Sequence, residues 1–414
     1  MTPWKTVRLK HLCLDAGQYG MNISSESYAD SGVRLLRTTD ISSGTLTPAE
    51  DGVFVSECTS DRFTLREGDL LLSRSGTPPG QSYLVKQDDR GSTFAGYLVR
   101  FRPANDVDPR FLSHVARSEP FQHTILSEAV ASTIQNFNAE RYANIEFRVP
   151  DQREQSRIAE FLDAETAQID RLIELRISHE RLVLERSEAV LSSLFSGQEG
   201  HRKYRFRHLM QSNPCYGVLV PKFAESGVPL IRVSDLGKLD HNLERLPRIE
   251  KGQAQEYRRT RLSPGDLLIT VVGATIGRCD VAPEATCGFN VSRALARIQL
   301  IPGLSPQMIA AWVRGRDFRA QAELATSGAA AQPALNMSDI THFSIWIPET
   351  DSGRRILANR VDDHVHQVQG LLSLLRQQRA LLAERRQALI TAAVTGQFDV
   401  STASGRNVTD GVQA

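Results

Sequence analysis

The 414-residue chain lacks several features that would assign it to common classes of protein. It has no apolar run near the roughly 20 residues needed to span a bilayer, and its first residues, MTPWKTVRLKHLCLDAGQ, lack the apolar core of a signal peptide. Its five cysteines are an odd number without a C-x-x-C pair, which argues against a disulfide framework or a zinc site. A reducing cytoplasm is therefore the expected compartment, and no membrane partner is expected.

Lysine is also scarce, because only 7 of the 49 basic residues are Lys and 42 are Arg. The planar guanidinium of Arg suits phosphates and guanine edges, but a GC-rich genome would produce the same bias. The formal net charge of +1 favours no class of partner.

Catalytic motifs are missing as well. The chain contains no G-x-x-x-x-G-K-[ST] phosphate loop, no H-E-x-x-H and no acidic residue two positions before a Lys. We interpret His364 and His366 as solvated residues at the start of a helix rather than metal ligands. The segment SNPCYG (212–217) is similar to the Asn-Pro-Pro-Tyr loop of amino-methyltransferases, but no glycine-rich cofactor loop accompanies it. The sequence predicts no catalytic or metal site, and a methyltransferase acting alone remains the enzyme alternative.

Two stretches without proline, 158–198 and 357–397, carry the same pattern and correspond without a gap. Their apolar residues alternate at spacings of about four and three, which is typical of a coiled-coil seam. Each stretch is expected to form one helix about 60 Å long, and the two should bury their seams against each other, either parallel or antiparallel. The predicted seam residues are Leu162, Ile169, Ile173, Val183, Val190, Leu194, Val361, Val365, Val368, Leu372, Leu375, Leu382 and Leu389.

Polar residues interrupt both seams. Of these, Glu180, Arg379 and Arg386 are candidates for contacts with partner proteins. The alternative is that they are polar positions tolerated at a wet edge, and the sequence leaves both interpretations open.

The segments before the two helices also repeat each other. GVRLLRTTD (32–40) returns as GVPLIRVSD (227–235), and GDLL (68–71) returns at 265–268 as a turn leading into a buried strand. Strand-like runs and a short helix at 109–118 predict a mixed α/β (α+β) fold. We therefore predict five parts: a first domain (1–150), a central helix (151–200), a second domain (201–348), a C-terminal helix (349–400) and a disordered tail (401–414).

The loops diverge between the two copies while the apolar positions agree, which indicates two sites with different specificities. Polar side chains at strand ends beside glycines could approach phosphates or base edges, although ordinary loop solvation explains them equally well. Asn138 and Asn336 fit either helix caps or base readers. The candidate DNA-binding residues are Arg37, Arg74, Ser75, Thr77, Asn138, Arg141, Arg232, Arg259, Thr270, Thr275, Arg278 and Asn336.

The order domain, helix, domain, helix resembles the specificity (S) subunit of type I restriction-modification enzymes over residues 1 to about 400. The first helix begins with a P-x-x-x-E-Q-x-x-I pattern at Pro150, Glu154, Gln155 and Ile158. The second copy keeps Pro348 and Leu357 but has arginines near the Glu-Gln position. The helix endings SGQ (196–198) and TGQ (395–397) are also typical of that family.

The resemblance implies that each domain is a target recognition domain reading one half of a split DNA sequence. It also implies that the helices set the spacer and dock two methyltransferase subunits, with a motor-nuclease subunit as a further partner. The chain would perform no chemistry, and S-adenosylmethionine, ATP and Mg²⁺ would bind the partners. The alternatives are an S-like subunit of a related system with a fused methyltransferase-nuclease, and a non-DNA coiled-coil assembly protein.

Overall fold

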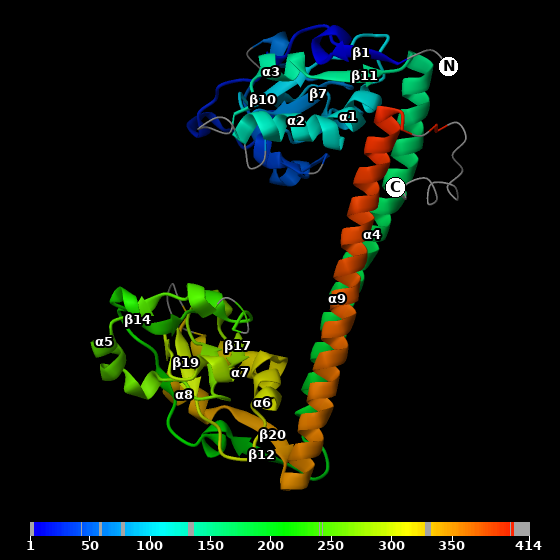
Figure 1. Cartoon of the computed structure of the whole chain (residues 1–414). Helices are drawn as coiled ribbons and strands as arrows, with labels where there is room; N and C mark the ends of the chain where they lie inside the picture. The colour runs from blue at the N-terminus through cyan, green and yellow to red at the C-terminus, as the bar shows by residue number, and fades with distance from the viewer. Residues whose placement is uncertain are drawn as a thin grey trace. The chain divides into compact units, whose positions relative to one another are not determined.

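The computed structural model describes residues 4–42, 44–57, 60–75, 79–130, 136–239, 241, 243–327, 333–397 and 399–400. The chain divides into two compact units. Unit 1 contains Met1–Arg176 and Gln377–Ala414, and unit 2 contains Ile177–Arg376 (Figure 1). Each unit thus combines one globular half of the sequence with part of both long helices. The predicted disordered tail (401–414) lies outside the described residues.

Unit 1 is built on small sheets. Its four-stranded antiparallel sheet has the order β2-β10-β7-β8, with bounds Gln18–Tyr19, Leu98–Phe101, Leu70–Ser73 and Ser82–Leu84. A three-stranded sheet has the order β6-β3-β9, with bounds Val53–Val55, Val33–Leu36 and Thr93–Phe94. Two further antiparallel pairs join β1 to β11 (Lys5–Arg8, Glu146–Val149) and β4 to β5 (Ile41–Ser42, Thr45–Leu46). The helices of this half are α1 (Pro109–Arg117), α2 (Glu119–Val130) and α3 (Ala139–Asn144).

Unit 2 repeats this plan. Its four-stranded sheet has the order β13-β19-β16-β17, with bounds Cys215–Tyr216, Leu295–Ile298, Leu267–Thr270 and Cys279–Val281. The order β15-β14-β18 corresponds to the three-stranded sheet of unit 1, with bounds Arg248–Ile249, Phe223–Ile231 and Asn290–Val291. Strand β12 (His201–Arg205) pairs with β20 (Ser344–Pro348) as β1 pairs with β11. The helices are α5 (Lys251–Glu256), α6 (Pro306–Arg314), α7 (Arg316–Thr326) and α8 (Met337–His342). This correspondence shows that the internal repeat is structural.

The repeated Gly-Asp pair forms the same turn in both units. Gly68 and Gly265 both have φ near +84°, a conformation in which glycine avoids the clash of a Cβ. The carboxylate of Asp69 accepts the backbone amide of Arg66 and binds Arg102, the residue directly after β10, at 2.7 Å. In unit 2 the carboxylate of Asp266 binds Arg297 of β19 at 2.6 Å. The Asp is therefore structural, because it closes the turn and joins two neighbouring strands.

The two long helices are α4 (Gln152–Leu194) and α9 (Asp351–Thr395). In unit 1, Leu162 and Ile169 of α4 share a hydrophobic core with Leu389 and Ala393, near the end of α9. In unit 2 the end of α4 packs against the beginning of α9, because Leu194 shares a core with Leu357 and Val361. The helices are therefore antiparallel, a direction that the seam pattern alone does not select.

None of the predicted seam residues is exposed. The domain boundaries stay predictions. Seven are buried and six are half-buried in the described structure. The buried ones are Leu162, Ile169, Leu194, Val361, Leu372, Leu375 and Leu389. The half-buried ones are Ile173, Val183, Val190, Val365, Val368 and Leu382.

Polar positions in the seam bind across it within each unit. In unit 1, Arg386 forms an ion pair with Asp170, whose carboxylate lies 2.9 Å from Nε of the arginine. In unit 2, Glu180 lies 4.0 Å from Arg376. The half-buried His364 lies 3.0 Å from the hydroxyl of Ser187, so the prediction that it is a solvated surface residue is wrong. Arg386 and Glu180 therefore have partners within the chain itself.

Candidate nucleic-acid interface

In unit 1, three distant segments meet at the end of β7. Arg74 donates from Nε to the side-chain oxygen of Asn136 at 3.2 Å, and its guanidinium lies 5.2 Å from the ring centre of Tyr19. The hydroxyl of Tyr19 accepts the backbone amide of Ala139 at 2.9 Å. Ser75 forms an isolated β-bridge with Asn136. Candidate residues after β7 and before α3, far apart in sequence, thus lie on one surface, while Thr77 lies outside the described residues.

The two asparagines are helix caps. The side-chain oxygen of Asn138 accepts the amide of Arg141 at 2.9 Å at the start of α3. Asn336 forms a capping box with Asp339 at the start of α8. Each satisfies an amide that the first helical turn leaves open. Arg141 is exposed, with its guanidinium 5.9 Å from the ring centre of Phe137.

Two of the predicted arginines hold turns. Arg37 binds Asp40 at 2.7 Å, and the hydrogen bond to that carboxylate raises the pKa of Arg37. Arg232 pairs with Asp235 in the same capping-box geometry at the corresponding turn of unit 2. The spacing Arg-x-x-Asp occurs in both copies of the sequence, and it is the signal that could have identified this structural role.

The remaining candidates of unit 2 differ in accessibility. Thr270 is completely buried at the end of β16, so its side chain offers no surface to DNA, because a polar residue at a strand end can also point into the core. Thr275 and Arg278 are exposed, and Arg278 donates to the carbonyl of Leu236. Arg259 is exposed, and its backbone carbonyl accepts Nη1 of Arg297 at 2.7 Å. Thr275, Arg278 and Arg259 therefore stay available as surface residues.

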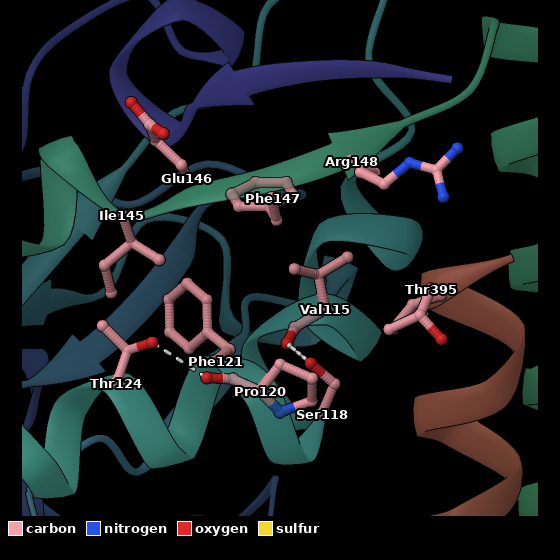
Figure 2. Close-up of a pocket in the computed structure, with 11 residues that line it drawn as sticks. Val115, Ser118, Pro120, Phe121, Thr124, Ile145, Glu146, Phe147, Arg148 and Thr395 are labelled. Carbon is pink, nitrogen blue, oxygen red and sulfur yellow. Dashed lines mark hydrogen bonds between the residues drawn. The ribbon is translucent and has the colours of Figure 1, made fainter. Parts of the chain in front are cut away.

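Unit 1 contains a pocket of about 190 Å³ between α1, α2, β11 and the end of α9 (Figure 2). Its apolar lining includes Val115, Phe121, Ile145 and Val394. The residues directly before β11 and β20 make the same hydrogen bond in the two units. The amide of Leu9 donates to the carbonyl of Ile145, and the amide of Phe206 donates to the carbonyl of Phe343. Ile145 and Phe343 are therefore equivalent residues, and the other residues around the pocket can be matched between the units from this pair.

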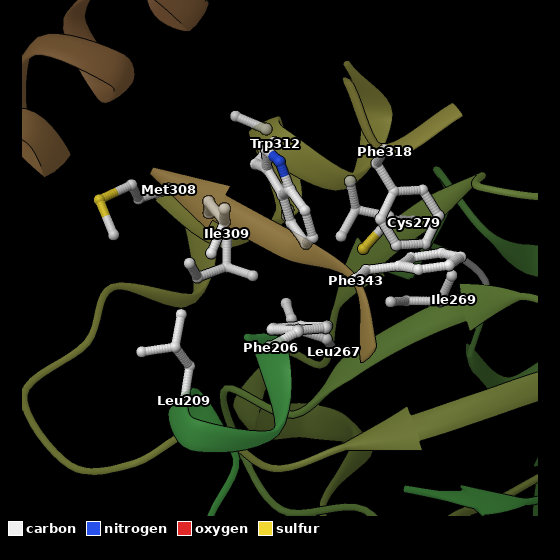
Figure 3. Close-up of a cluster of buried hydrophobic side chains, with 14 of the residues drawn as sticks. Phe206, Leu209, Leu267, Ile269, Cys279, Met308, Ile309, Trp312, Phe318 and Phe343 are labelled. Atoms are coloured by element: carbon white, nitrogen blue, oxygen red, sulfur yellow. The ribbon is translucent and has the colours of Figure 1, made fainter. Parts of the chain in front are cut away.

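The equivalent positions in unit 2 are filled by rings. Trp312, Phe343 and Phe195 stand where unit 1 has Val115, Ile145 and Val394, and all three rings are buried. Trp312 and Phe318 pack edge to face with their centres 5.2 Å apart, and Phe318 packs on Phe343 at 5.1 Å (Figure 3). The site in unit 2 is thus a packed core.

A buried polar group joins α1 to α4 in unit 1. His114 is almost fully buried, and its Nε2 lies 2.8 Å from the carboxylate of Asp163. Burial lowers the pKa of His114, and the hydrogen bond to Asp163 opposes this shift. Burial, with the nearby charge of Arg386, lowers the pKa of Arg117 to about 10. This group lies against the helix pair and not on the surface formed by Arg74 and Arg141.

Metal-binding clusters and membrane-spanning helices are both absent from the described part of the chain. Among these residues, no cluster of three or more His, Cys, Asp or Glu side chains could hold a metal ion. Nor is any described helix long and apolar enough to cross a membrane.

Comparison with known proteins identifies the duplicated architecture. Residues 1–179 match the family model described as the type I restriction modification DNA specificity domain. The chain is 29% identical over 145 residues to the specificity subunit of the Escherichia coli type I restriction enzyme EcoBI, covering 34% of this chain and 30% of that protein. It is 27% identical over 193 residues to the EcoKI specificity subunit of Escherichia coli strain K12, covering 43% and 41%. Residues 1–179 thus carry a type I restriction modification DNA specificity domain, and the chain is similar to the specificity subunits of these enzymes.

Solved structures extend the likeness to the fold of nearly the whole chain. A chain from a study of complex assembly and conformational transition of the type I R-M system superposes with a TM-score of 0.71 at 20% identity, covering 96% of this chain and 99% of that one. The HsdS subunit from Thermoanaerobacter tengcongensis superposes with a TM-score of 0.52 at 19% identity, covering 96% and 98%. The predicted fold class is confirmed. The matched sequence spans less than half of each Escherichia coli relative.

Sequence reasoning missed two features of this chain. The first is the glycine of each helix ending, since a Cβ on Gly396 would meet the ring of Trp4 at 3.2 Å and one on Gly197 would meet Trp346 at 3.3 Å. Trp4 precedes β1 whereas Trp346 lies in β20, so no repeated sequence signal marks the two indoles. The second is the side-chain amide of Gln253, whose oxygen and nitrogen both form hydrogen bonds to the backbone of the segment before β14.

Proposed function

We propose that the chain is the DNA sequence-recognition subunit of a type I restriction-modification complex. Each globular half reads one half of a bipartite target, the helices set the spacer, and they dock two methyltransferase subunits. The subunit itself is not catalytic, and S-adenosylmethionine, ATP and Mg²⁺ bind its partners. A motor-nuclease subunit is a further partner, and the cytoplasmic location stays a prediction.

One observation carries this proposal. The same strand orders occur twice, and each copy presents different exposed side chains around an equivalent tyrosine. Tyr19 lies beside Arg74 in unit 1, whereas the hydroxyl of Tyr216 donates to Leu335 in unit 2. Two copies of one scaffold with different surfaces suit a protein that reads two different sequences.

Methylome sequencing of cells that carry this chain with its methyltransferase partner tests the proposal directly. We expect one bipartite methylated sequence with two constant halves separated by unspecified bases. Exchange of residues 1–150 for those of another family member should change one half alone. A change in both halves would contradict the modular arrangement, and salt-independent binding of the complex to duplex DNA would favour an assembly protein. A separate motor gene beside this one would distinguish this system from one with a fused methyltransferase-nuclease.

The spacer role can be tested by shortening both helices by one heptad. Because α4 and α9 are antiparallel, deletion of 177–183 should be combined with deletion of 373–379, so that both seams keep their register. Seven residues span about 10 Å of helix, or about three base pairs of duplex. We expect unchanged half-sites with a shorter spacer. Altered half-sites with the original spacer would contradict the spacer role.

Exposed leucines on the helices support the docking role. Leu182 is 53% exposed on α4 and Leu374 is 58% exposed on α9, although both lie in helices that bury a seam. Their replacement by Ser should weaken capture of the methyltransferase without lowering the melting temperature. Leu324→Ser on α7, where the leucine is 77% exposed, is the matched control.

A further inference from the structure

Unit 2 holds three large apolar side chains in solvent within five residues. Leu219 is 56% exposed, Val220 is 70% exposed and Phe223 is 60% exposed. The preceding residue, Val218, is completely buried. Isolated exposed apolar residues are ordinary on protein surfaces, but a contiguous group is typical of a contact site.

A buried amide fixes this loop. Gln253 of α5 donates from Nε2 to the carbonyl of Val220 at 2.8 Å, and its side-chain oxygen accepts the amide of Lys222 at 2.8 Å. The amide of Glu250 donates to the carbonyl of Lys222 at 3.1 Å. A Cβ on Gly217 would overlap the carbonyl oxygen of Val291, so the loop begins tightly packed on its sheet. The apolar side chains are thus held outward by a rigid support, with little conformational entropy left to lose on contact.

Basic residues occur on the loop itself and on the segments that are bonded to the loop or to the strand before it. Lys222 lies within it, Lys251 follows on α5, and Arg258 and Arg259 come after that helix, all with exposed side chains. The backbone of Arg259 is fixed to the strand before the loop, because its carbonyl accepts the thiol of Cys215 at 3.2 Å. Exposed Glu225, Glu250 and Glu256 lie on the same segments, where the four basic side chains still outnumber them. An apolar group accompanied by exposed basic residues complements a polyanion with stacked apolar interiors, which describes duplex DNA.

Unit 1 lacks this feature. After Tyr19-Gly20, the equivalent segment buries Met21 and exposes Asn22, Ser24 and Glu26. The apolar loop is therefore a property of unit 2 and not of the duplicated scaffold.

We propose that Leu219, Val220 and Phe223 form an apolar wedge that enters between base pairs of the DNA half-site read by unit 2 and bends it. Lys222 and Arg259 hold the flanking phosphates. The wedge rests on the proposed function, since it assumes that unit 2 binds DNA. A bend makes the recognised sequence depend on how easily its base steps unstack, including steps without hydrogen bonds to the protein.

The test uses the full chain in complex with its methyltransferase partner and a duplex carrying the methylated sequence found in cells. The triple variant Leu219→Ser, Val220→Ser, Phe223→Ser should bind this duplex at least about tenfold more weakly. The bend measured by energy transfer between the duplex ends should decrease, and a 2-aminopurine placed in the unit 2 half-site should lose its unstacking signal. The salt dependence of binding should stay unchanged, because these side chains neutralise no phosphate.

Two controls separate the explanations. Leu324→Ser removes an even more exposed leucine from α7 and should leave affinity and bend unchanged. Lys222→Ala should reduce the salt slope by about one while keeping the bend. An unaltered bend and affinity in the triple variant would overturn the wedge alone. Loss of methyltransferase capture with intact DNA bending would show that the loop binds protein instead. Failure of the unaltered complex to bind DNA in a salt-dependent manner would contradict the proposed function itself.

Discussion

Units 1 and 2 share their strand orders but differ in the interior beneath the helix that follows the sheet. Helices α1 and α6 both begin with a capped Pro, after Asp108 and Ser305 respectively. Beneath α1 the side chains leave a pocket of about 190 Å³, whereas the equivalent side chains beneath α6 are a buried tryptophan and phenylalanines. The two copies therefore share a topology although the side chains in this part of the core differ in volume. This is expected if approximate size and apolar character are enough to specify a fold.

Polarity differs at the same place. His114 of α1 is buried with Asp163 as its partner, whereas Ala311 occupies the equivalent position on α6. Unit 1 thus joins α1 to the long helices partly through a titratable group, and unit 2 does so through apolar packing. The two copies should consequently respond differently to mutation and to pH.

The largest expected difference concerns the equivalent residues Trp312 and Val115. Trp312→Ala removes a ring that contacts Phe206 and Phe318, and we expect it to lower the free energy of unfolding of unit 2 by about 3–5 kcal/mol. Val115→Ala should cost unit 1 much less, because Val115 lines an existing pocket and has less surface to lose. Urea denaturation followed by hydrogen exchange in each unit measures both effects. Equal losses would show that the pocket is filled in solution.

Much of this architecture could be predicted from the sequence. The long helices follow from apolar spacing, and the Gly-Asp turns follow from a turn pair directly before an apolar run. The direction of the helix pair could not be predicted, because a seam reads the same in both directions. Asn138 was ambiguous because asparagine suits both a helix cap and a base edge, and local hydrogen bonding decided for the cap.

Other features depend on side chains that only the folded chain brings together. The expectation that Thr270 lies at the surface is wrong because β16 is buried along its whole length. The pocket arises from side chains on α1, β11 and α9, none of which is unusual alone. Contact with DNA bases stays a prediction, since it depends on loop surfaces for which no code relates residue type to base.

The second difference concerns the glycines that end the long helices. Gly396 has φ of +72° and lies against Trp4, whereas Gly197 lies against Trp346 without a positive φ. Gly396→Ala should cost about 1–2 kcal/mol, because an L-residue is strained there, in addition to contact with the indole. Gly197→Ala should cost less. Thermal unfolding of both variants provides the measurement, and a larger loss for Gly197→Ala would contradict the role of backbone strain.

The third difference is pH dependence. Burial lowers the pKa of His114 below its unfolded value of 6.5, so the unfolded chain binds a proton more readily than the folded chain. Unit 1 should therefore lose stability as the pH falls from about 6.5 toward the lowered folded pKa, while higher pH preserves it. Arg117, Arg386, Asp163 and Asp170 are the charged groups around this helix contact.

His114→Ala, which reproduces the alanine of unit 2, should remove that part of the pH dependence. Denaturation curves between about pH 5 and pH 8 measure it. An unchanged pH profile in the variant would mean that other groups control the stability of unit 1 in this range.

The smallest expected effect is an increase in the stability of unit 1. Val394→Phe places in unit 1 the residue that unit 2 has as Phe195, next to the pocket lined by Phe121 and Ile145. A pocket of about 190 Å³ is larger than the additional ring atoms, so the ring can enter without displacing the lining, and we expect about 1 kcal/mol of stabilisation. The same substitution at Ala393, which is already buried in packed surroundings, is the control and should destabilise unit 1 through overpacking. Destabilisation by Val394→Phe would show that the pocket cannot accept the volume that the second copy contains. The two interiors would then differ in shape as well as in side-chain size.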